Sequence, residues 1–306
     1  MRSGLRSSAA WGVLPVAVGV LSLLLPSGAY AQGTGEPTVS DSKTGYIDNA
    51  IPGSLFRLRF DDAFDNSRAT RAEFFYAKSG PSGPGLPRPE PRVDYQELLP
   101  YLEWAATPQL SGFVELPERF LHPEVNPSAA GLSDMNVGFK YAFLYGPDLV
   151  ATFQLRTYIP TGNARRGLGN NHVTLEPGLL VYKPLPGRLG LMGELRPWIP
   201  AGGTDFAGDI LRYGLGLQYG LYGSDRVLLT PVLELVGWTV LDGKVSAVYP
   251  AAVVVRDAAG QTIVNAKAGF RLTWNGFGDF YAGYGRPLTG DRWYDHTLRL
   301  EFRMFF

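Results

Sequence analysis

The most constraining feature of the sequence is an alternation of apolar and polar side chains that recurs along most of the chain. The last ten residues show it clearly: every second side chain from Leu298 to Phe306 is apolar, and Arg299, Glu301 and Arg303 lie between them. Successive side chains of a β-strand point to opposite faces, so a period of two predicts strands with one apolar and one polar face.

The same alternation predicts twelve strands, and most of them have the roughly 9–11 residues that cross a bilayer as a tilted strand. They are 55–60, 96–105, 109–117, 135–143, 151–159, 172–182, 189–199, 211–219, 227–238, 264–274, 278–286 and 297–306. The gaps between them alternate strictly between short turns and longer loops, as in barrels with tight periplasmic turns and longer outside loops. The predicted fold class is therefore all-β: a transmembrane up-and-down antiparallel β-barrel of the outer-membrane type, with about 12 strands.

The composition fits this fold and excludes several other classes. Charged residues make up 18% of the chain, below the ~25% of soluble globular domains, and no cysteine occurs. Lysine plus arginine and aspartate plus glutamate both number 28, so no strongly basic surface for nucleic acid is expected. Disulfide frameworks, thiolate metal sites and cysteine nucleophiles are excluded as well.

The first 31 residues have the pattern of a secretory signal peptide. Arg2 and Arg6 precede an apolar run over 9–25, and the small-residue motif Ala29-Tyr30-Ala31 predicts cleavage before Gln32. A retained membrane anchor is the alternative. No later apolar run has the length of ~20 residues that a spanning helix needs.

The expected organisation after the signal peptide 1–31 is an N-terminal periplasmic segment, 32–53, and an outer-membrane barrel, 54–306. Within the barrel, 61–95 is predicted to be a long loop, because five prolines between residues 81 and 91 favour polyproline II and exclude an interior strand. This loop is expected either to cover the mouth of the barrel or to fold into it. Asp61-Asp62, at its start, is interpreted as a pair of solvated loop charges.

By parity, the polar face of each strand lines the lumen, where water and counter-charges accept charge. The predicted solute path consists of Lys140, Arg156, Glu176, Glu194, Arg196, Arg212, Glu234, Lys267, Arg271, Arg299, Glu301 and Arg303, and Arg57, Arg59, Glu103 and Glu115 face the same way. These residues are ten basic and six acidic, and the mild positive excess would favour anions or neutral polar aromatic solutes.

Three aromatic residues near the predicted long-loop ends of strands fall on the lumen side of the alternation. Tyr158, Trp198 and Trp238 could form an aromatic collar on which a ring-bearing solute stacks. The alternative is that β-bulges turn them to the lipid face, where interfacial aromatic belts are common.

The sequence contains few residues or motifs typical of catalysis or of metal and cofactor binding. Its three histidines show no metal-ligand spacing, and no nucleophile, phosphate-loop or dinucleotide motif occurs. The nearest approach to the His-x-Ser pair of outer-membrane lipases is His172-Val173-Thr174, which carries threonine and points inward by parity. Loop 161–171, with Arg165-Arg166, could cradle an anion or be a flexible loop. The chain is therefore expected to be no enzyme and to need no cofactor or metal.

One region resembles a known family. Gly131-Leu132-Ser133-Asp134 opens a strand that continues to Gly138-Phe139-Lys140-Tyr141, and the next strand ends in Pro160-Thr161-Gly162. Together with 172–182, this pattern resembles the outer-membrane transporters named for the meta-pathway of phenol degradation (the MetA-pathway family), over roughly 131–306. The resemblance implies uptake of small aromatic or hydrophobic compounds, and it identifies no solute.

The leading functional hypothesis is passive uptake of small solutes through an outer-membrane channel, possible ligands being aromatic or hydrophobic. The alternatives are a non-transporting structural or adhesive barrel with a plugged lumen, a barrel enzyme and a secreted soluble β-domain. The expected location is the outer membrane of a Gram-negative cell. The expected partners are outer-membrane lipids, a small-molecule solute and the barrel assembly machinery, which would recognise Phe306; nucleic acid is not among them.

Overall fold

A computed structural model of the chain describes residues 42–66, 85–88, 90–202, 207–223, 227–249, 252–274, 277–290 and 292–306. The expected signal peptide and residues 67–84 of the expected long loop lie outside these ranges. Within them, the helical structure is a single 3-10 turn, Ala164–Arg166. No helix in the described part of the chain is long and apolar enough to cross a membrane.

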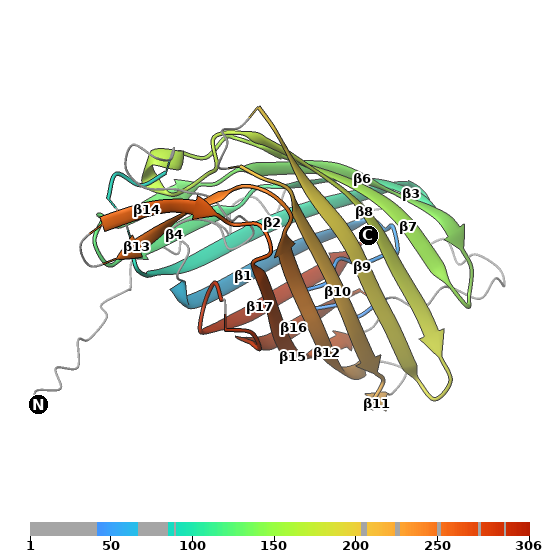
Figure 1. The fold of residues 1–306 in the computed structure, drawn as a ribbon. Coiled ribbons are helices and arrows are strands. Elements are labelled where there is room, and N and C mark those ends of the chain that lie inside the picture. The colour runs from blue at the N-terminus through green and yellow to red at the C-terminus, as the bar shows by residue number, and fades with distance from the viewer. Residues whose placement is uncertain are drawn as a thin grey trace, which may run out of the picture. The chain divides into compact units, whose positions relative to one another are not determined.

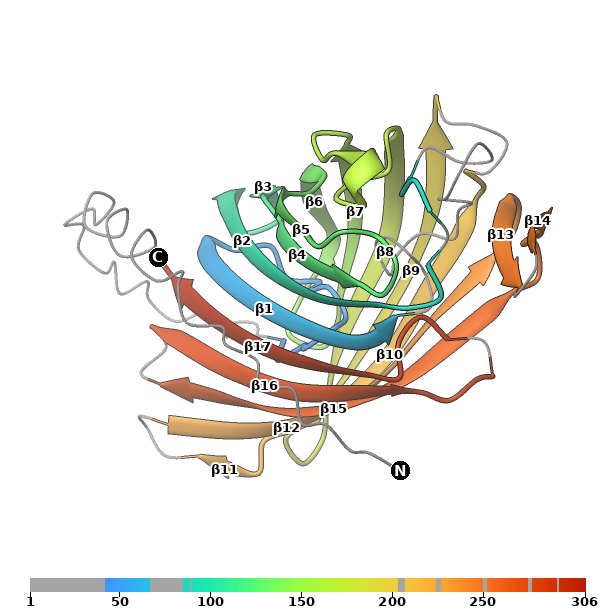
Figure 2. The same ribbon diagram turned by 90° about the vertical axis from the view of Figure 1, so that its left-hand side faces the viewer.

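The strands form one closed antiparallel sheet (Figures 1 and 2). Its wall has twelve staves, where a stave is either one continuous strand or two short strands that follow one another along the same line. Its order follows the chain, and β1 pairs with both β2 and β17, which closes the barrel without a free edge. From residue 150 onward the barrel has eight uninterrupted staves: β7 (Val150–Ile159), β8 (Val173–Leu185), β9 (Leu189–Ala201), β10 (Ile210–Tyr219), β12 (Val227–Val240), β15 (Thr262–Trp274), β16 (Gly278–Pro287) and β17 (His296–Phe305). The predicted fold class is confirmed.

The first four staves include two that are interrupted. β1 (Leu55–Asn66) and β2 (Val93–Thr107) are continuous, whereas β3 (Leu110–Glu115) with β4 (Glu118–Pro123), and β5 (Ala129–Leu132) with β6 (Met135–Tyr145), each form one broken stave. β3 and β4 both pair with β2, and the break between them falls at Leu116-Pro117, where proline has no N–H to donate.

All twelve predicted strands are present, and the differences lie at their ends. Residues 118–131, expected to be a loop, extend the sheet as the β4–β5 hairpin. β1 continues six residues beyond its predicted end, so 61–66 belongs to the wall and not to the loop. The expected loop 241–261 contains a separate hairpin of β13 (Lys244–Tyr249) and β14 (Ala252–Asp257), and β11 (Tyr222–Gly223) pairs with β12.

The distribution of side chains is inverted relative to a water-soluble protein. Large apolar side chains at the middle of staves are exposed, for example Leu235 (46%) and Leu300 (46%), whereas Arg196, Glu176 and Arg271 are at most 1% exposed. A sheet that spans lipid must close its backbone hydrogen bonds and present apolar side chains outward. The barrel therefore has an apolar outer wall and a charged interior.

Aromatic side chains mark the ends of the outer wall. Trp104 and Tyr219, near the short turns, and Tyr284, toward the long-loop end, are all exposed. Such rings are favoured at the two membrane–water interfaces, where an apolar body meets a polar edge.

Candidate functional site in the barrel lumen

Residues 42–54 lie inside the barrel, which differs from the expectation that 32–53 is a periplasmic segment. The amide of Lys43 donates to Gln218 on β10 (2.7 Å), and the amide of Gly53 donates to Glu103 on β2 (3.2 Å). The segment therefore crosses the lumen before the chain enters β1. We refer to residues 42–54 as the inserted segment.

The carboxylate of Glu234, on β12, holds the middle of the inserted segment. It accepts hydrogen bonds from the consecutive backbone amides of Gly45, Tyr46 and Ile47 at 2.8–3.1 Å. A charged acceptor makes such bonds stronger than neutral ones, and it satisfies backbone donors that a non-regular segment cannot satisfy itself. Glu234 thus fixes the position of this segment against the barrel wall.

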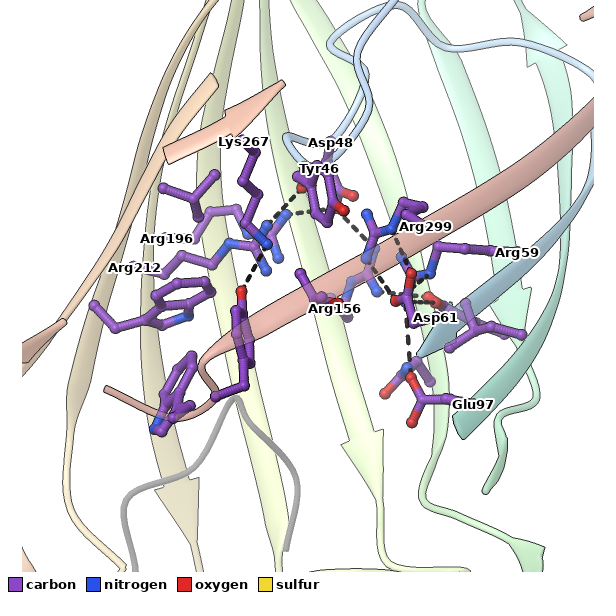
Figure 3. Close-up of a pocket in the computed structure, with 18 of the residues that line it drawn as sticks. Tyr46, Asp48, Arg59, Asp61, Glu97, Arg156, Arg196, Arg212, Lys267 and Arg299 are labelled. Carbon is purple, nitrogen blue, oxygen red and sulfur yellow. Dashed lines mark hydrogen bonds and ion pairs between the residues drawn. The ribbon is translucent and has the colours of Figure 1, made fainter. Parts of the chain in front are cut away.

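Asp48 is the residue of the inserted segment whose carboxylate binds arginines of the barrel wall (Figure 3). Its Oδ2 lies 2.8 Å from Nη2 of Arg156 and 2.5 Å from Nη1 of Arg196, and it also accepts from Gln154 at 3.0 Å. Burial by itself would raise the pKa of the Asp48 carboxyl, but the guanidinium groups of Arg156, Arg196 and Arg212 hold that pKa well below its usual range. Asp48 is therefore ionised and pairs with at least two staves.

Tyr46 places an aromatic ring next to two cations. Nζ of Lys267 lies 3.6 Å from the ring centroid, and the guanidinium carbon of Arg299 lies 3.9 Å from it. Cations over the face of a tyrosine ring are attracted by its quadrupole. The inserted segment is therefore bound by rings as well as by charges.

The residues predicted to line the solute path lie in the lumen, and most of them pair with one another. Arg196 bonds Glu176 (2.5 Å) and Glu194 (3.1 Å), and Arg212 bonds Glu194 (2.8 Å). Further pairs join Lys140 to Glu103 (2.9 Å), Arg271 to Glu301 (2.8 Å), and both Arg271 and Arg303 to Asp279 (2.6 Å each). Arg57 and Arg59 lie within 3.8 Å of Glu115.

Four acidic residues of the lumen were missed by the sequence reasoning: Asp48, Asp61, Glu97 and Asp279. Asp61 accepts two hydrogen bonds of 2.6 Å from Arg299, so its interpretation as a solvated loop charge is wrong. Glu97 binds Arg119, a basic residue that was also missed. The signal that could have found these acids is the predicted excess of basic groups, since a narrow interior requires counter-charges.

Among the described residues, two cavities of the lumen bear on its function. The larger is lined by residues from the long-loop half of the staves and has about 70 Å³ in which the centre of a water molecule fits. The smaller, of about 20 Å³, lies against Leu55, Tyr101 and Glu103 of the short-turn half. Tyr46 and Asp48 line both cavities, so the inserted segment lies between them.

The three aromatic residues proposed for a collar are inward and buried. Trp238 contacts Trp293 with ring centroids 4.3 Å apart, and Trp198 lies edge-on to Tyr158 at 6.2 Å. The hydroxyl of Tyr158 donates to Glu176 (2.7 Å). Tyr158 and Trp238 line the larger cavity, and Trp198 does not.

In the glycine-rich loop 161–171, several backbone amides are bonded to acceptors of the protein itself. Asp134, at the β5–β6 junction, accepts from the amides of Gly162 (3.1 Å) and Asn170 (2.8 Å). Thr161 bonds the same junction by accepting from Met135 N (2.9 Å). The residues that carry the family resemblance thus join the β5–β6 junction to the loop 161–171 by hydrogen bonds. Asp134 is the anion that the amides of this loop bind.

The acidic groups of the lumen that the structure describes are not arranged as a metal site. No group of three or more His, Asp or Glu in the described ranges is placed to hold a metal ion. His172, in the motif compared with lipases, is buried with Nδ1 2.9 Å from the carbonyl of Asn170. The chemistry of this lumen is that of fixed charge pairs, hydrogen-bond donors and aromatic rings.

The fold and lumen define an outer-membrane-type β-barrel, and comparison with solved structures agrees. An outer membrane channel from Pseudomonas putida F1 aligns with a TM-score of 0.55 over 89% of this chain and 99% of that one, at 12% identity. NanC porin (0.48; 81% and 99%; 7% identity) and the β domain of the Bordetella autotransporter BrkA (0.47; 83% and 100%; 15% identity) are also similar. No protein-family profile and no curated protein matches the sequence.

Proposed function

We propose that this protein is an outer-membrane channel that admits small solutes down their concentration gradient. The observation that carries the proposal is a closed barrel with an apolar outer wall, whose charged interior contains cavities on both sides of the inserted segment. The apolar outer wall supports a position in lipid, and the charged lumen supports a polar route for solutes through it.

The inserted segment makes the route narrow. Twelve staves lie between small barrels filled by side chains and the wide barrels of general porins. Tyr46 and Asp48 separate the two cavities, so we propose that passage occurs at this point and is limited to small solutes. Tyr158 and Trp238, which line the larger cavity, support aromatic compounds among those solutes, as the sequence resemblance implies.

Planar-bilayer recording and liposome swelling test this function. We expect small conductance steps with a mild anion preference, because Lys267 has no carboxylate partner among the described residues. Swelling should be measurable with the smallest sugars and should fall steeply with solute size. The absence of both conductance and swelling from correctly folded protein would reject the channel.

A second candidate is a non-transporting barrel with a plugged lumen and a structural or adhesive role. The observation in its favour is the number of bonds that hold the inserted segment, including those to Glu234, Arg156 and Arg196. Liposome swelling separates the two functions, since a permanently plugged barrel passes no solute. Binding to host or matrix surfaces through the long loops would then be measured directly.

A channel of this kind would reside in the outer membrane and depend on the machinery that exports and assembles it. We propose export by the signal peptide 1–31, assembly by the outer-membrane barrel machinery through Phe306, and residence among outer-membrane lipids. Fractionation of cells that express the full chain, and of a Phe306→Ser variant, tests this route. Recovery of the wild-type chain in the soluble periplasm would overturn it.

A further inference from the structure

The larger lumen cavity has an electrostatic asymmetry. Its lining includes six basic side chains (Arg59, Arg156, Arg196, Arg212, Lys267 and Arg299) and four acidic ones (Asp48, Asp61, Glu97 and Glu115). Each of these carboxylates already binds an arginine. Arg196 and Arg212 also pair with Glu176 and Glu194, which are not among the lining residues, so Lys267 is the lining cation without a carboxylate partner among the described residues.

Lys267 is the cation of the lining that an external anion could bind. Its side chain is buried, with 7% of the residue exposed, and no carboxylate in the described part of the chain lies within ion-pair distance of Nζ. Its polar partner is the hydroxyl of Tyr294 (2.9 Å), and the ring face of Tyr46 lies on another side (3.6 Å). An ammonium has three N–H donors, so one hydrogen bond leaves capacity for an anionic acceptor.

Aromatic rings surround the same corner of the cavity. Trp238 and Trp293 are in contact with each other, Tyr294 is bonded to Lys267, and the guanidinium of Arg212 lies 5.5 Å from the Trp238 ring centroid. All four residues line the cavity with Lys267. A planar ring can pack against such a wall while its charged substituent contacts the cation.

The size of the cavity limits the ligand. At ~10–15 Å³ of such space per water, the cavity of about 70 Å³ holds roughly five waters. Replacing these waters with a ligand gives room for one ring and a short acidic substituent. Bulkier anions would require the inserted segment or the loops to move.

From this combination we propose that the larger cavity binds a small single-ring aromatic carboxylate, with its carboxylate on Lys267 and its ring against Trp238, Trp293 and Tyr294. This assignment rests on the proposed channel function, for which it names a solute class. It requires only equilibrium binding, which can be measured without any flux.

Isothermal titration calorimetry of the full-length mature protein in detergent tests the site, with benzoate as the probe. We expect saturable binding of benzoate, and binding at least about tenfold weaker for benzyl alcohol and for cyclohexanecarboxylate, because each lacks one of the two features that the site recognises. Acetate tests for a simple anion site. If acetate or cyclohexanecarboxylate binds as tightly as benzoate, or if benzoate does not bind at all, the proposal is overturned.

Variants locate the site. Lys267→Met keeps an unbranched side chain that is one atom shorter and removes the charge, and it should weaken benzoate binding by about tenfold or more. Lys183→Met, at an exposed position near the β8–β9 turn, is the matched control and should bind as the wild type does. Equal affinity of Lys267→Met and the wild type would overturn the assignment. Should Lys267→Met not fold, the ligand series on the wild-type protein still decides the question.

The binding result and the channel function can fail independently. Benzoate binding in a protein that shows no conductance and no swelling supports the site and rejects the channel. Conductance in a protein that does not bind benzoate keeps the channel and rejects the site.

Discussion

Asp48 of the inserted segment lies 2.5 Å from Arg196 of β9, so an ion pair joins the chain's N-terminal residues to the barrel wall across 148 positions of sequence. Arg156 of β7 bonds the same carboxylate oxygen. This one aspartate therefore connects the inserted segment to two staves and keeps it between the two cavities.

Asp48→Asn should loosen the inserted segment. Removing one partner of a buried ion pair costs about 3–5 kcal/mol, and the remaining carboxylates near Arg156 and Arg196 place this variant at the lower end, about 3 kcal/mol. We expect a several-fold rise in mean conductance in planar bilayers. Asp148→Asn, at an exposed turn, is the control. An unchanged conductance in Asp48→Asn would show that the segment does not limit passage.

A charge on the outer wall should destabilise the barrel according to its depth. Leu300→Arg, in the middle of β17, should cost about 2–4 kcal/mol, because the outer face meets acyl chains there. Leu288→Arg, just beyond the end of β16, should cost about 0–1 kcal/mol. Reversible urea unfolding in lipid vesicles measures both. Similar costs at the two positions would argue against a lipid-facing wall at Leu300.

The loop fastened by Asp134 should open when its packing is disturbed. A Cβ at Gly169 would lie 2.3 Å from Oδ1 of Asp134 and 2.8 Å from the carbonyl oxygen of Gly162, so Gly169→Ala must displace this bonded corner. We expect faster tryptic cleavage after the exposed Arg165 and Arg166. Gly112→Ala, where the nearest atom is 3.8 Å away, should be cleaved at the wild-type rate. Equal rates for the two variants would mean that Asp134 does not hold the loop closed.

The strands could be predicted because their signal is local. In each stave, apolar and polar side chains alternate along the sequence. Lipid outside requires apolar side chains and the lumen accepts charged ones, so both faces give the same alternation, as at Leu298 and Arg299. In the missed extensions, β4–β5 and 61–66, the outward face is interrupted by polar residues such as Asp62 and Glu118. Local alternation weakens there, although backbone pairing continues.

The inserted segment could not be predicted in the same way. Its contacts join residues far apart in sequence, such as Gly45 and Glu234, which are separated by 189 positions, and it has neither alternation nor helical period. Charge balance offered an indirect signal, since ten basic and six acidic lumen residues called for further acids. Asp48 and Asp61 are two of the acids that supply the balance.

Spin-label accessibility along β12 tests the central claim most directly. The chain has no cysteine, so single labels can be placed at 233 and 235, which are exposed on the outer wall, and at 232 and 236, which are buried on the lumen side. In proteoliposomes, labels at 233 and 235 should be accessible to oxygen dissolved in lipid and protected from a water-soluble nickel reagent, whereas those at 232 and 236 should show low oxygen accessibility. Labels at 233 and 235 that meet the nickel reagent and not the lipid would contradict a barrel with its apolar face in the membrane.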